Sequence, residues 1–309
     1  MRLVIAGGTG FLGRALTATL AADGHAVVCL SRSGGAAPRP GAIWPQSGIA
    51  TIHWRGDEET EGWGHVIDGA DVVVNLAGES IAARRWTAKQ KDRLRDSRLL
   101  TARAMGRAIR DADRPPALFV SASAVGIYGD RADERLDEEA QPGTDFLANL
   151  AVAWEQAAVD AGGSRAPVVR LRTGLVLARD GGALAKMLPP FRAGLGGPLG
   201  HGAQYMPWIH IDDWVALVRW IVERRADGVF NLTAPEPVTN AEFAKALGRA
   251  LGRPALLPAP RFALRLLLGE MADALLLSGQ RAVPRRALEL GFAFRYPTID
   301  AALGTLFGR

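Results

Sequence analysis

The stretch RLVIAGGTGFLGRAL, residues 2–16, decides the fold. Residues 2–6 form a short, mainly apolar run typical of a strand, and residues 11–22 carry apolar side chains at helical spacing. Between them, Gly7, Gly10 and Gly13 form a G-x-x-G-x-x-G pattern. Because this pattern follows a strand and opens a helix, it predicts a loop that binds the diphosphate of a dinucleotide.

Each glycine of this loop has its own physical reason. Gly7 permits a tight turn, Gly10 lets a diphosphate approach the backbone, and Gly13 lets the helix pack close to the sheet. The helix N-terminus adds free N–H groups and the positive end of the helix dipole. The predicted cofactor contacts of the loop are Gly7, Thr9, Gly10, Phe11, Leu12 and Gly13.

The end of the second predicted strand indicates which dinucleotide is bound. NAD sites commonly place an acidic residue here to bind the ribose hydroxyls. This chain has Ser31, Arg32 and Ser33 instead. An arginine and two hydroxyls can bind a 2′-phosphate that a carboxylate would repel, so the sequence favours NADP over NAD.

Strand-like and helix-like runs alternate through the first half of the chain. After the first strand, the expected strands are residues 26–30, 51–54, 71–77, 117–123 and 167–177, with helices at 11–22, 87–112 and 146–161. Apolar strands separated by helices predict an α/β fold, a Rossmann-type doubly wound parallel sheet. We expect residues 1–177 to form this dinucleotide-binding domain.

The second half of the chain differs in composition and in its pattern of elements. A Gly- and Pro-rich stretch at residues 188–208 predicts an irregular loop over a pocket. A segment near 208–234 returns to the sheet as a helix, with Asp212 as its N-cap, and a strand. Residues 178–207 and 235–309 are expected to form a smaller substrate part, and its tail after Pro254 is predicted to be helical without strands.

The charge and composition of the chain bear on its location and on whether nucleic acids or membranes are partners. The formal charge of the 309 residues is +5, and acids are interspersed in the densest basic stretch, residues 83–98, so we expect no nucleic acid partner. The single cysteine, Cys29, lies in an apolar run and fits a small buried side chain and a cytoplasmic location. The apolar stretch 261–277 is broken by Arg265, Glu270 and Asp273, which predicts an amphipathic or buried helix rather than a membrane partner.

An ordered set of motifs carries a family resemblance: GGTGFLG, SRS, NLAGE, SASAVGIYGD, AWE, GLGGPLG and PWIHIDD. With these motifs the chain resembles the atypical extended short-chain dehydrogenase/reductases, and in particular the epimerase family related to nucleoside-diphosphate-sugar epimerases. Residues 254–303 resemble that family's C-terminal domain of unknown function. The resemblance implies the strand order 3-2-1-4-5-6-7 and further cofactor contacts at Ala77, Gly78, Glu79, Arg98 and Leu175.

The same resemblance raises the question of the proton carrier. Short-chain dehydrogenases pair a serine after the fifth strand with Tyr-x-x-x-Lys on the next helix. Ser123 matches the serine, but Leu147 and Ala151 stand near the other two places, and the chain has no Tyr-x-x-x-Lys. Ser123 and Tyr128 are therefore the predicted catalytic residues, with Asp145, His201 and His210 as alternatives, and no metal site is expected.

These observations leave two functions open. The first is an NADP(H)-dependent oxidoreductase or epimerase acting on a small polar or sugar-nucleotide-like substrate, in which Ser123 holds the reacting oxygen. The second is an NADPH-binding regulatory protein that has lost catalysis, which the missing relay permits. The sequence leaves the oligomeric state open, including a homodimer.

Overall fold

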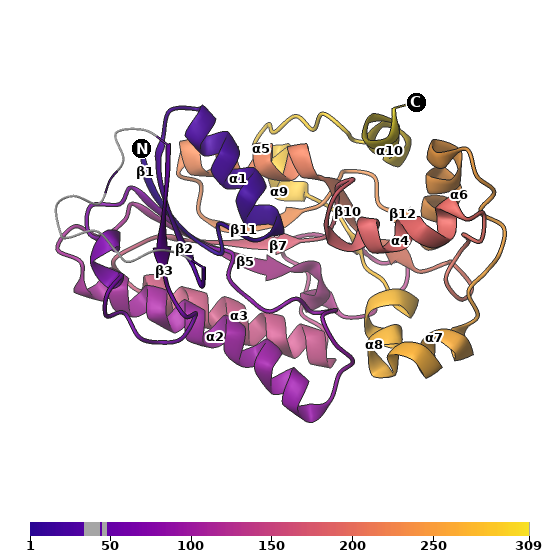
Figure 1. Cartoon of the computed structure of the whole chain (residues 1–309), viewed down its shortest axis with the longest axis horizontal. Coiled ribbons are helices and arrows are strands. Elements are labelled where there is room, and N and C mark those ends of the chain that lie inside the picture. The colour runs from indigo at the N-terminus through magenta and orange to yellow at the C-terminus, as the bar shows by residue number, and fades with distance from the viewer. Residues whose placement is uncertain (34–43, 45–47, 309) are drawn as a thin grey trace.

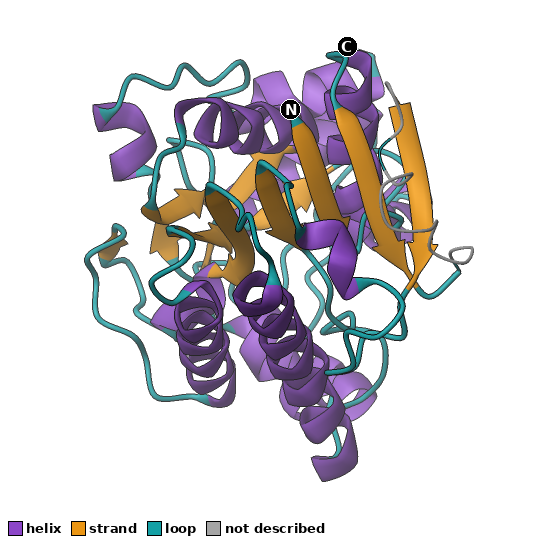
Figure 2. Ribbon diagram, turned by 90° about the vertical axis from the view of Figure 1, so that its left-hand side faces the viewer, coloured by secondary structure: helices purple, strands orange, loops and turns teal. Residues whose placement is uncertain are grey.

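The structure, a computed structural model, describes residues 1–33, 44 and 48–308. Its centre is a seven-stranded sheet in the order β11-β7-β5-β4-β1-β2-β3, with every neighbouring pair parallel. This arrangement confirms the predicted α/β fold and strand order (Figures 1 and 2). The strands are β1 (Arg2–Ala6), β2 (Ala26–Ser31), β3 (Gly48–His53), β4 (Val72–Asn75), β5 (Leu118–Ala124), β7 (Val168–Thr173) and β11 (Gly228–Leu232).

Helices cover both faces of this sheet. Alternate residues of β1 point to opposite sides, and each set joins a separate buried core. Leu3 packs with side chains of α1 (Phe11–Ala22) and α5 (Ile211–Arg224). Val4 packs in the other core, beside α2 (Ala88–Asp111) and α3 (Phe146–Gly162), which run side by side in Figure 1.

Local capping explains where the helices begin. The side chain of Thr87 accepts a hydrogen bond from the amide of Gln90 at the start of α2, and Asp145 caps α3 through the amide of Ala148. The predicted cap of α5 was wrong by two residues. His210 is its N-cap, because its ring Nδ1 accepts from the amide of Asp212 at 3.1 Å, and Asp212 lies in the first turn.

Two predicted elements in the middle of the chain were wrong. The expected strand 167–177 breaks at Gly174, and β8 (Leu175–Leu177) pairs instead with β10 (Trp208–His210) in a separate sheet. The expected loop is helical as far as Arg192, since α4 (Gly182–Arg192) continues through two prolines. Leu184, Leu188 and Phe191 recur at helical spacing and anchor α4 in a third buried core.

The C-terminal part is mainly helical but contains short strands. The tail was expected to have no strand, yet β13 (Arg281–Ala282) runs parallel to β6 (Arg135–Leu136), a pairing too short to leave a sequence pattern. The remaining elements are β9 (Tyr205–Met206), β12 (Val238–Thr239), α6 (Asn240–Leu251), α7 (Arg261–Leu268), α8 (Glu270–Ala272), α9 (Arg285–Glu289) and α10 (Ile299–Phe307), with a π-helical turn at Asp273–Leu277 and 3₁₀ turns at Gly64–Ile67 and Val125–Tyr128. Cys29 is buried in β2, as predicted.

None of the helices in the described ranges is long and apolar enough to cross a membrane.

The contact between α2 and α3 generates a first prediction. A Cβ on Gly106 of α2 would lie 2.6 Å from the Cα of Ala161 on α3. Gly106→Ala should therefore lower the free energy of unfolding by about 1–3 kcal/mol through overpacking, although alanine is favoured over glycine in an isolated helix by about 1 kcal/mol. Urea denaturation measures this change.

Arg107→Ala, on the exposed side of α2, is the control and should change stability by less than about 0.5 kcal/mol. A stabilised Gly106→Ala protein would contradict the packing described.

Candidate active site

The glycine loop is fixed by close backbone contacts. Gly7 has a φ of +78°, and a Cβ there would lie 3.0 Å from the backbone of Leu76 and Ala77, after β4. A Cβ on Gly13 would lie 2.1 Å from the carbonyl oxygen of Gly7. Side chains at these two positions would therefore push α1 away from the sheet, which is the reason for glycine at each.

The N-terminus of α1 has no side-chain cap. Gly10 is the N-cap residue, and the first bond of the helix runs from the amide of Arg14 to the carbonyl of Gly10 at 2.9 Å. The N–H groups of Phe11, Leu12 and Gly13 therefore have no acceptor within the helix. Gly10 is less crowded than Gly13, since a Cβ there would meet a single atom, the carbonyl oxygen of Gly7 at 3.2 Å. This end of α1 is suited to bind an anionic group.

Hydroxyl groups connect the loop to the end of β2. The Thr9 Oγ1 and Ser31 Oγ atoms are 2.8 Å apart, and Ser31 Oγ lies 3.1 Å from Ser33 Oγ. Arg32 lies between these serines in the sequence and is exposed.

Sequence reasoning missed one residue beside this cluster. Arg14 donates from Nη1 to the carbonyl oxygen of Thr9 at 3.0 Å, which holds a second guanidinium beside the hydroxyl cluster. The signal was present as an arginine directly after the third glycine. Arg14 and Arg32 therefore give this end of the loop two cations.

The half-buried Arg98 holds the segment after β4 in place. Arg98 donates from Nη2 to the carbonyl oxygen of Glu79 at 3.1 Å and from Nη1 to that of Leu94 at 2.8 Å, and it stacks on Trp154. Burial lowers the pKa of Arg98 to about 10, against the opposing effect of the Glu79 carboxylate, and the side chain stays charged at neutral pH. The structure thus uses Arg98 to position residues 77–79, which we expected to contact a cofactor together with Arg98 itself.

The last two predicted contacts lie where α4 meets α1. The ring of Phe11 packs against the start of α4, because a Cβ on Gly181 would be 2.5 Å from that ring. Leu175 donates its backbone N–H to the carbonyl of Pro207 at 2.7 Å. Leu175 is half-buried beside α4 in the third core. The predicted contacts therefore come from β1, α1, β2, the segment after β4, α2 and β8.

The stretch SASAVGIYGD lies in a buried polar network. Ser123 Oγ donates to Glu155 Oε1 at 2.7 Å, and both carboxylate oxygens of Glu155 accept from Arg172, at 2.8 and 3.0 Å. Arg172 also donates to the Tyr128 hydroxyl at 3.0 Å, and that hydroxyl donates to Asn231 Oδ1 at 2.7 Å. All five side chains are buried. The network joins β5, α3, β7 and β11.

The surroundings of Tyr128 bear on its predicted catalytic role, which stays a prediction. Its side chain is fully buried, its hydroxyl has two partners, and burial raises its pKa to about 12, so the geometry does not suit a proton carrier at neutral pH. The Ser123 hydroxyl is likewise committed to Glu155. Leu147 packs in an apolar cluster and Ala151 in another, so the usual relay places are apolar in space as well.

The side chains predicted as alternative proton carriers also have hydrogen-bond partners in the structure. Asp145 and His210 are helix caps, and the exposed His201 accepts from the backbone amide of Ala203 at 3.0 Å. Burial lowers the pKa of His210, so its ring is neutral at neutral pH. Among the described residues, no three His, Cys, Asp or Glu side chains are grouped to hold a metal ion.

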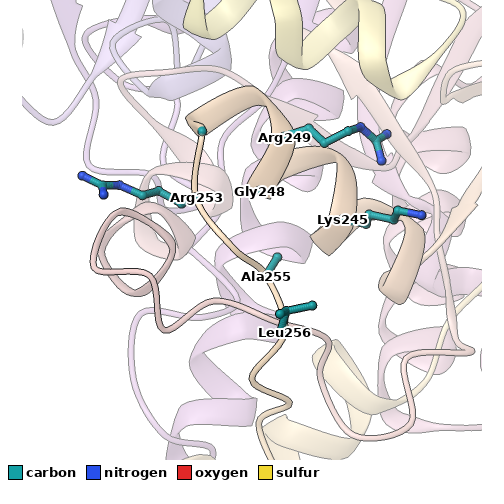
Figure 3. A pocket seen from close by; sticks show the side chains of 7 residues that line it. Lys245, Gly248, Arg249, Arg253, Ala255 and Leu256 are labelled. Carbon is teal, nitrogen blue, oxygen red and sulfur yellow. The ribbon is translucent and has the colours of Figure 1, made fainter.

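A separate pocket lies at the C-terminal end of α6. It has a volume of about 340 Å³, and Figure 3 shows Lys245, Arg249 and Arg253 around it, with Ala255 and Leu256 in the following loop. It contains none of the predicted site residues.

The parallel sheet, the uncapped helix after β1 and the hydroxyl–arginine cluster define a Rossmann-type α/β protein whose first strand–helix turn is built for a dinucleotide. Residues 3–233 match the NAD dependent epimerase/dehydratase family, and residues 259–306 match a domain of unknown function, DUF1731. The chain belongs to the NAD dependent epimerase/dehydratase family, and the resemblance seen in its motifs is confirmed.

Individual relatives extend over the whole chain. An epimerase family protein of Mycobacterium bovis is 44% identical over 303 residues, which cover 98% of this chain and 96% of the relative. The crystal structure of human epimerase family protein SDR39U1 (isoform 2) with NADPH has a TM-score of 0.89 at 38% identity and covers both chains fully. A nucleoside-diphosphate sugar epimerase from Corynebacterium glutamicum is 34% identical with a TM-score of 0.76, and the match covers all of this chain and 59% of that one.

The buried network generates a second prediction. Glu155→Gln should lower the free energy of unfolding by about 3–5 kcal/mol because it leaves the Arg172 charge uncompensated. Tyr128→Phe should cost about 1–3 kcal/mol, since it leaves Asn231 Oδ1 without its donor. Ser123→Ala should cost least, about 1 kcal/mol, because Arg172 still binds Glu155. Urea denaturation at pH 7 ranks the three, with Tyr205→Phe at a half-buried site as the control.

The phenol of Tyr128 adds a pH dependence. Its pKa of about 12 in the folded chain exceeds the value of about 10 in an unfolded one. The stability it contributes is therefore complete below about pH 10 and is lost as pH rises from about 10 to 12. Tyr128→Phe should reduce the fall in unfolding free energy over this range. An unchanged fall, or a Ser123→Ala protein less stable than Glu155→Gln, would contradict the network.

Proposed function

We propose that the chain is an NADP(H)-dependent oxidoreductase or epimerase of the extended short-chain dehydrogenase/reductase type, acting on a small polar or sugar-nucleotide-like substrate. The single observation that carries the proposal is the uncapped N-terminus of α1 beside the cluster of Thr9, Ser31 and Ser33. The NADPH in the crystal structure of the human relative supports the same cofactor.

The residues present fit this cofactor. The diphosphate would lie at the free N–H groups of Phe11, Leu12 and Gly13, where the absent side chain of Gly10 leaves the backbone accessible. The 2′-phosphate would lie at the three hydroxyls, between Arg14 and Arg32. Residues 77–79, which Arg98 positions, would lie along the rest of the cofactor. Leu175 would contact the cofactor as well. When bound, the nicotinamide supplies a hydride donor or acceptor.

The role of the chain in proton transfer differs from our first expectation. Ser123 binds Glu155, so we propose that it fixes the end of β5 and that a substrate oxygen takes its proton from water or from a residue of the substrate part. The apolar relay positions Leu147 and Ala151 favour a second candidate, a cofactor-binding regulatory protein without catalysis. Following NADPH absorbance with a panel of carbonyl and sugar-nucleotide compounds distinguishes the two, because turnover of any compound supports the first.

A paired substitution tests where the diphosphate binds. Gly10→Val should fold, because the position has extended backbone and its Cβ would require only a small shift of one atom, the Gly7 carbonyl oxygen at 3.2 Å. It should nevertheless weaken NADPH binding at least about a hundredfold, or about 2.8 kcal/mol. Gly13→Val should instead unfold the domain, because its Cβ would collide with the Gly7 carbonyl. Circular dichroism and calorimetric titration measure the two effects. Normal NADPH binding by folded Gly10→Val would place the cofactor elsewhere.

Cofactor choice tests the hydroxyl–arginine cluster. The protein should bind NADPH at least about tenfold more tightly than NADH, a difference of about 1.4 kcal/mol. Arg14→Ala and Arg32→Ala should each weaken NADPH binding about tenfold and leave NADH binding unchanged, because only NADPH carries the 2′-phosphate. Calorimetric titration with both cofactors gives two affinities for the unchanged protein, for each variant and for the control, Arg107→Ala. An equal loss of affinity for NADPH and NADH would show that the arginines bind a part that both cofactors share, not the 2′-phosphate.

A further inference from the structure

An exposed apolar surface lies at the far end of the C-terminal part. Twelve large apolar residues in the described chain are exposed, and six of them gather in two neighbouring segments. Leu256 is 80% exposed and Leu266 78%, and no residue of α7 is buried. Single exposed leucines are ordinary, but several exposed apolar side chains on neighbouring segments are typical of a binding surface. We call this group the α7 surface: Leu195, Leu256, Leu257, Phe262, Leu266 and Leu267.

Backbone hydrogen bonds hold the α7 surface together. The amide of Leu257 donates to the carbonyl of Gly196 at 3.1 Å, and that of Ala259 donates to Pro198 at 2.9 Å. The segment that leads from α6 to α7 is thereby fixed to the segment after α4. Figure 1 shows α7 at one end of the long axis of the molecule, below α6. The surface is thus a defined part of the fold.

Cations border this surface. Leu256 lines the pocket of about 340 Å³ together with Lys245, Arg249 and Arg253 (Figure 3). Arg249 pairs with Asp300 at 2.6 Å. Within the described ranges, Lys245 and Arg253 form no ion pair within 4.0 Å, whereas the pKa of Asp273 is lowered by the bond from Arg265 at 2.8 Å and also by the charge of Arg261. The surface therefore combines apolar side chains with two cations, Lys245 and Arg253, that form no ion pair.

The helix α7 itself has the same composition. Phe262 and Leu266 are four residues apart and share one exposed face, and Arg261 and Arg265 lie beside them at the same spacing. Arginines next to an apolar face can bury their methylene groups while the guanidinium stays at the polar boundary. This pattern is that of a helix lying in a lipid interface.

We propose that the α7 surface docks on an anionic phospholipid bilayer. The apolar side chains would enter the boundary between headgroups and acyl chains, and Lys245 and Arg253 would bind lipid phosphates. The pocket beside Leu256 would receive a headgroup. The proposal concerns the bilayer surface, not a span, and it replaces the expectation that membranes are not partners.

The cations make a second copy of the chain an unfavourable partner for the α7 surface. A two-fold contact places a surface against its own counterpart, so the unpaired cations of one copy would lie close to those of the other. Anionic lipids would instead neutralise them. An acidic protein partner shares this complementarity, and the experiment below distinguishes it from a bilayer.

Vesicle flotation with the full chain and bound NADPH tests the proposal. The protein should float with phosphatidylcholine vesicles that contain about a third phosphatidylglycerol, and not with phosphatidylcholine alone. Phe262→Asp combined with Leu266→Asp, and Lys245→Glu combined with Arg253→Glu, should each lower the bound fraction about tenfold or more. The matched controls, Leu288→Asp for the apolar pair and Arg107→Glu with Arg110→Glu for the charges, should bind like the unchanged protein.

Every outcome decides for or against the proposal. NADPH affinity, measured on each variant, checks that the protein is folded. If a double variant is not folded, Arg253→Gln alone replaces it in the flotation experiment. Failure of the unchanged protein to float, or equal binding to neutral vesicles, would overturn the proposal. Light scattering that shows a dimer abolished by Phe262→Asp, without flotation, would assign the surface to a second copy. Retention by an acidic polypeptide such as polyglutamate, again without flotation, would assign it to a protein partner.

Discussion

The close approach of α1 to the turn after β1 is the constraint on which the rest of the structure depends. Gly13 lies against the Gly7 carbonyl so closely that a Cβ would come within 2.1 Å of it, and Gly7 in turn lies against the backbone after β4. This contact sets the position of α1 over the sheet and directs its uncapped N-terminus to the carboxyl edge of the strands. The hydroxyls of β2, the segment after β4 and the start of α4 all gather at that edge.

A second constraint acts on the opposite side of the sheet. The carboxylate of Glu155 neutralises Arg172, and through Ser123, Tyr128 and Asn231 this pair connects three strands to α3. Asn231 also donates to the carbonyl of Val283, which ties the C-terminal part into the network. A buried charge needs a partner, so these residues fix one another. The stretch SASAVGIYGD therefore has a packing role in this network, through Ser123 and Tyr128.

The sequence predicted the elements that have strong local signals. β1 and α1 begin and end where the pattern places them, because continuous apolar runs and glycine turns are local features. The order of the seven major strands agrees with the one that the family resemblance implies. α4 was missed because its prolines conceal the spacing of Leu184, Leu188 and Phe191. In the site, the glycine loop and the SRS cluster could be predicted from residue types alone. The partners of Ser123 and Tyr128 could not, because Glu155, Arg172 and Asn231 meet them only through tertiary contacts.

Amide hydrogen exchange with and without NADPH tests the central claim most directly, because it reports where the cofactor binds without a known substrate. The account predicts slower exchange on adding NADPH in peptides that cover residues 7–14, 31–33 and 76–79, with the strongest protection at Phe11, Leu12 and Gly13, whose amides have no acceptor in the helix. Exchange in residues 256–267 should not change. Protection confined to the pocket at Lys245, Arg249 and Arg253, with none at the start of α1, would contradict the account.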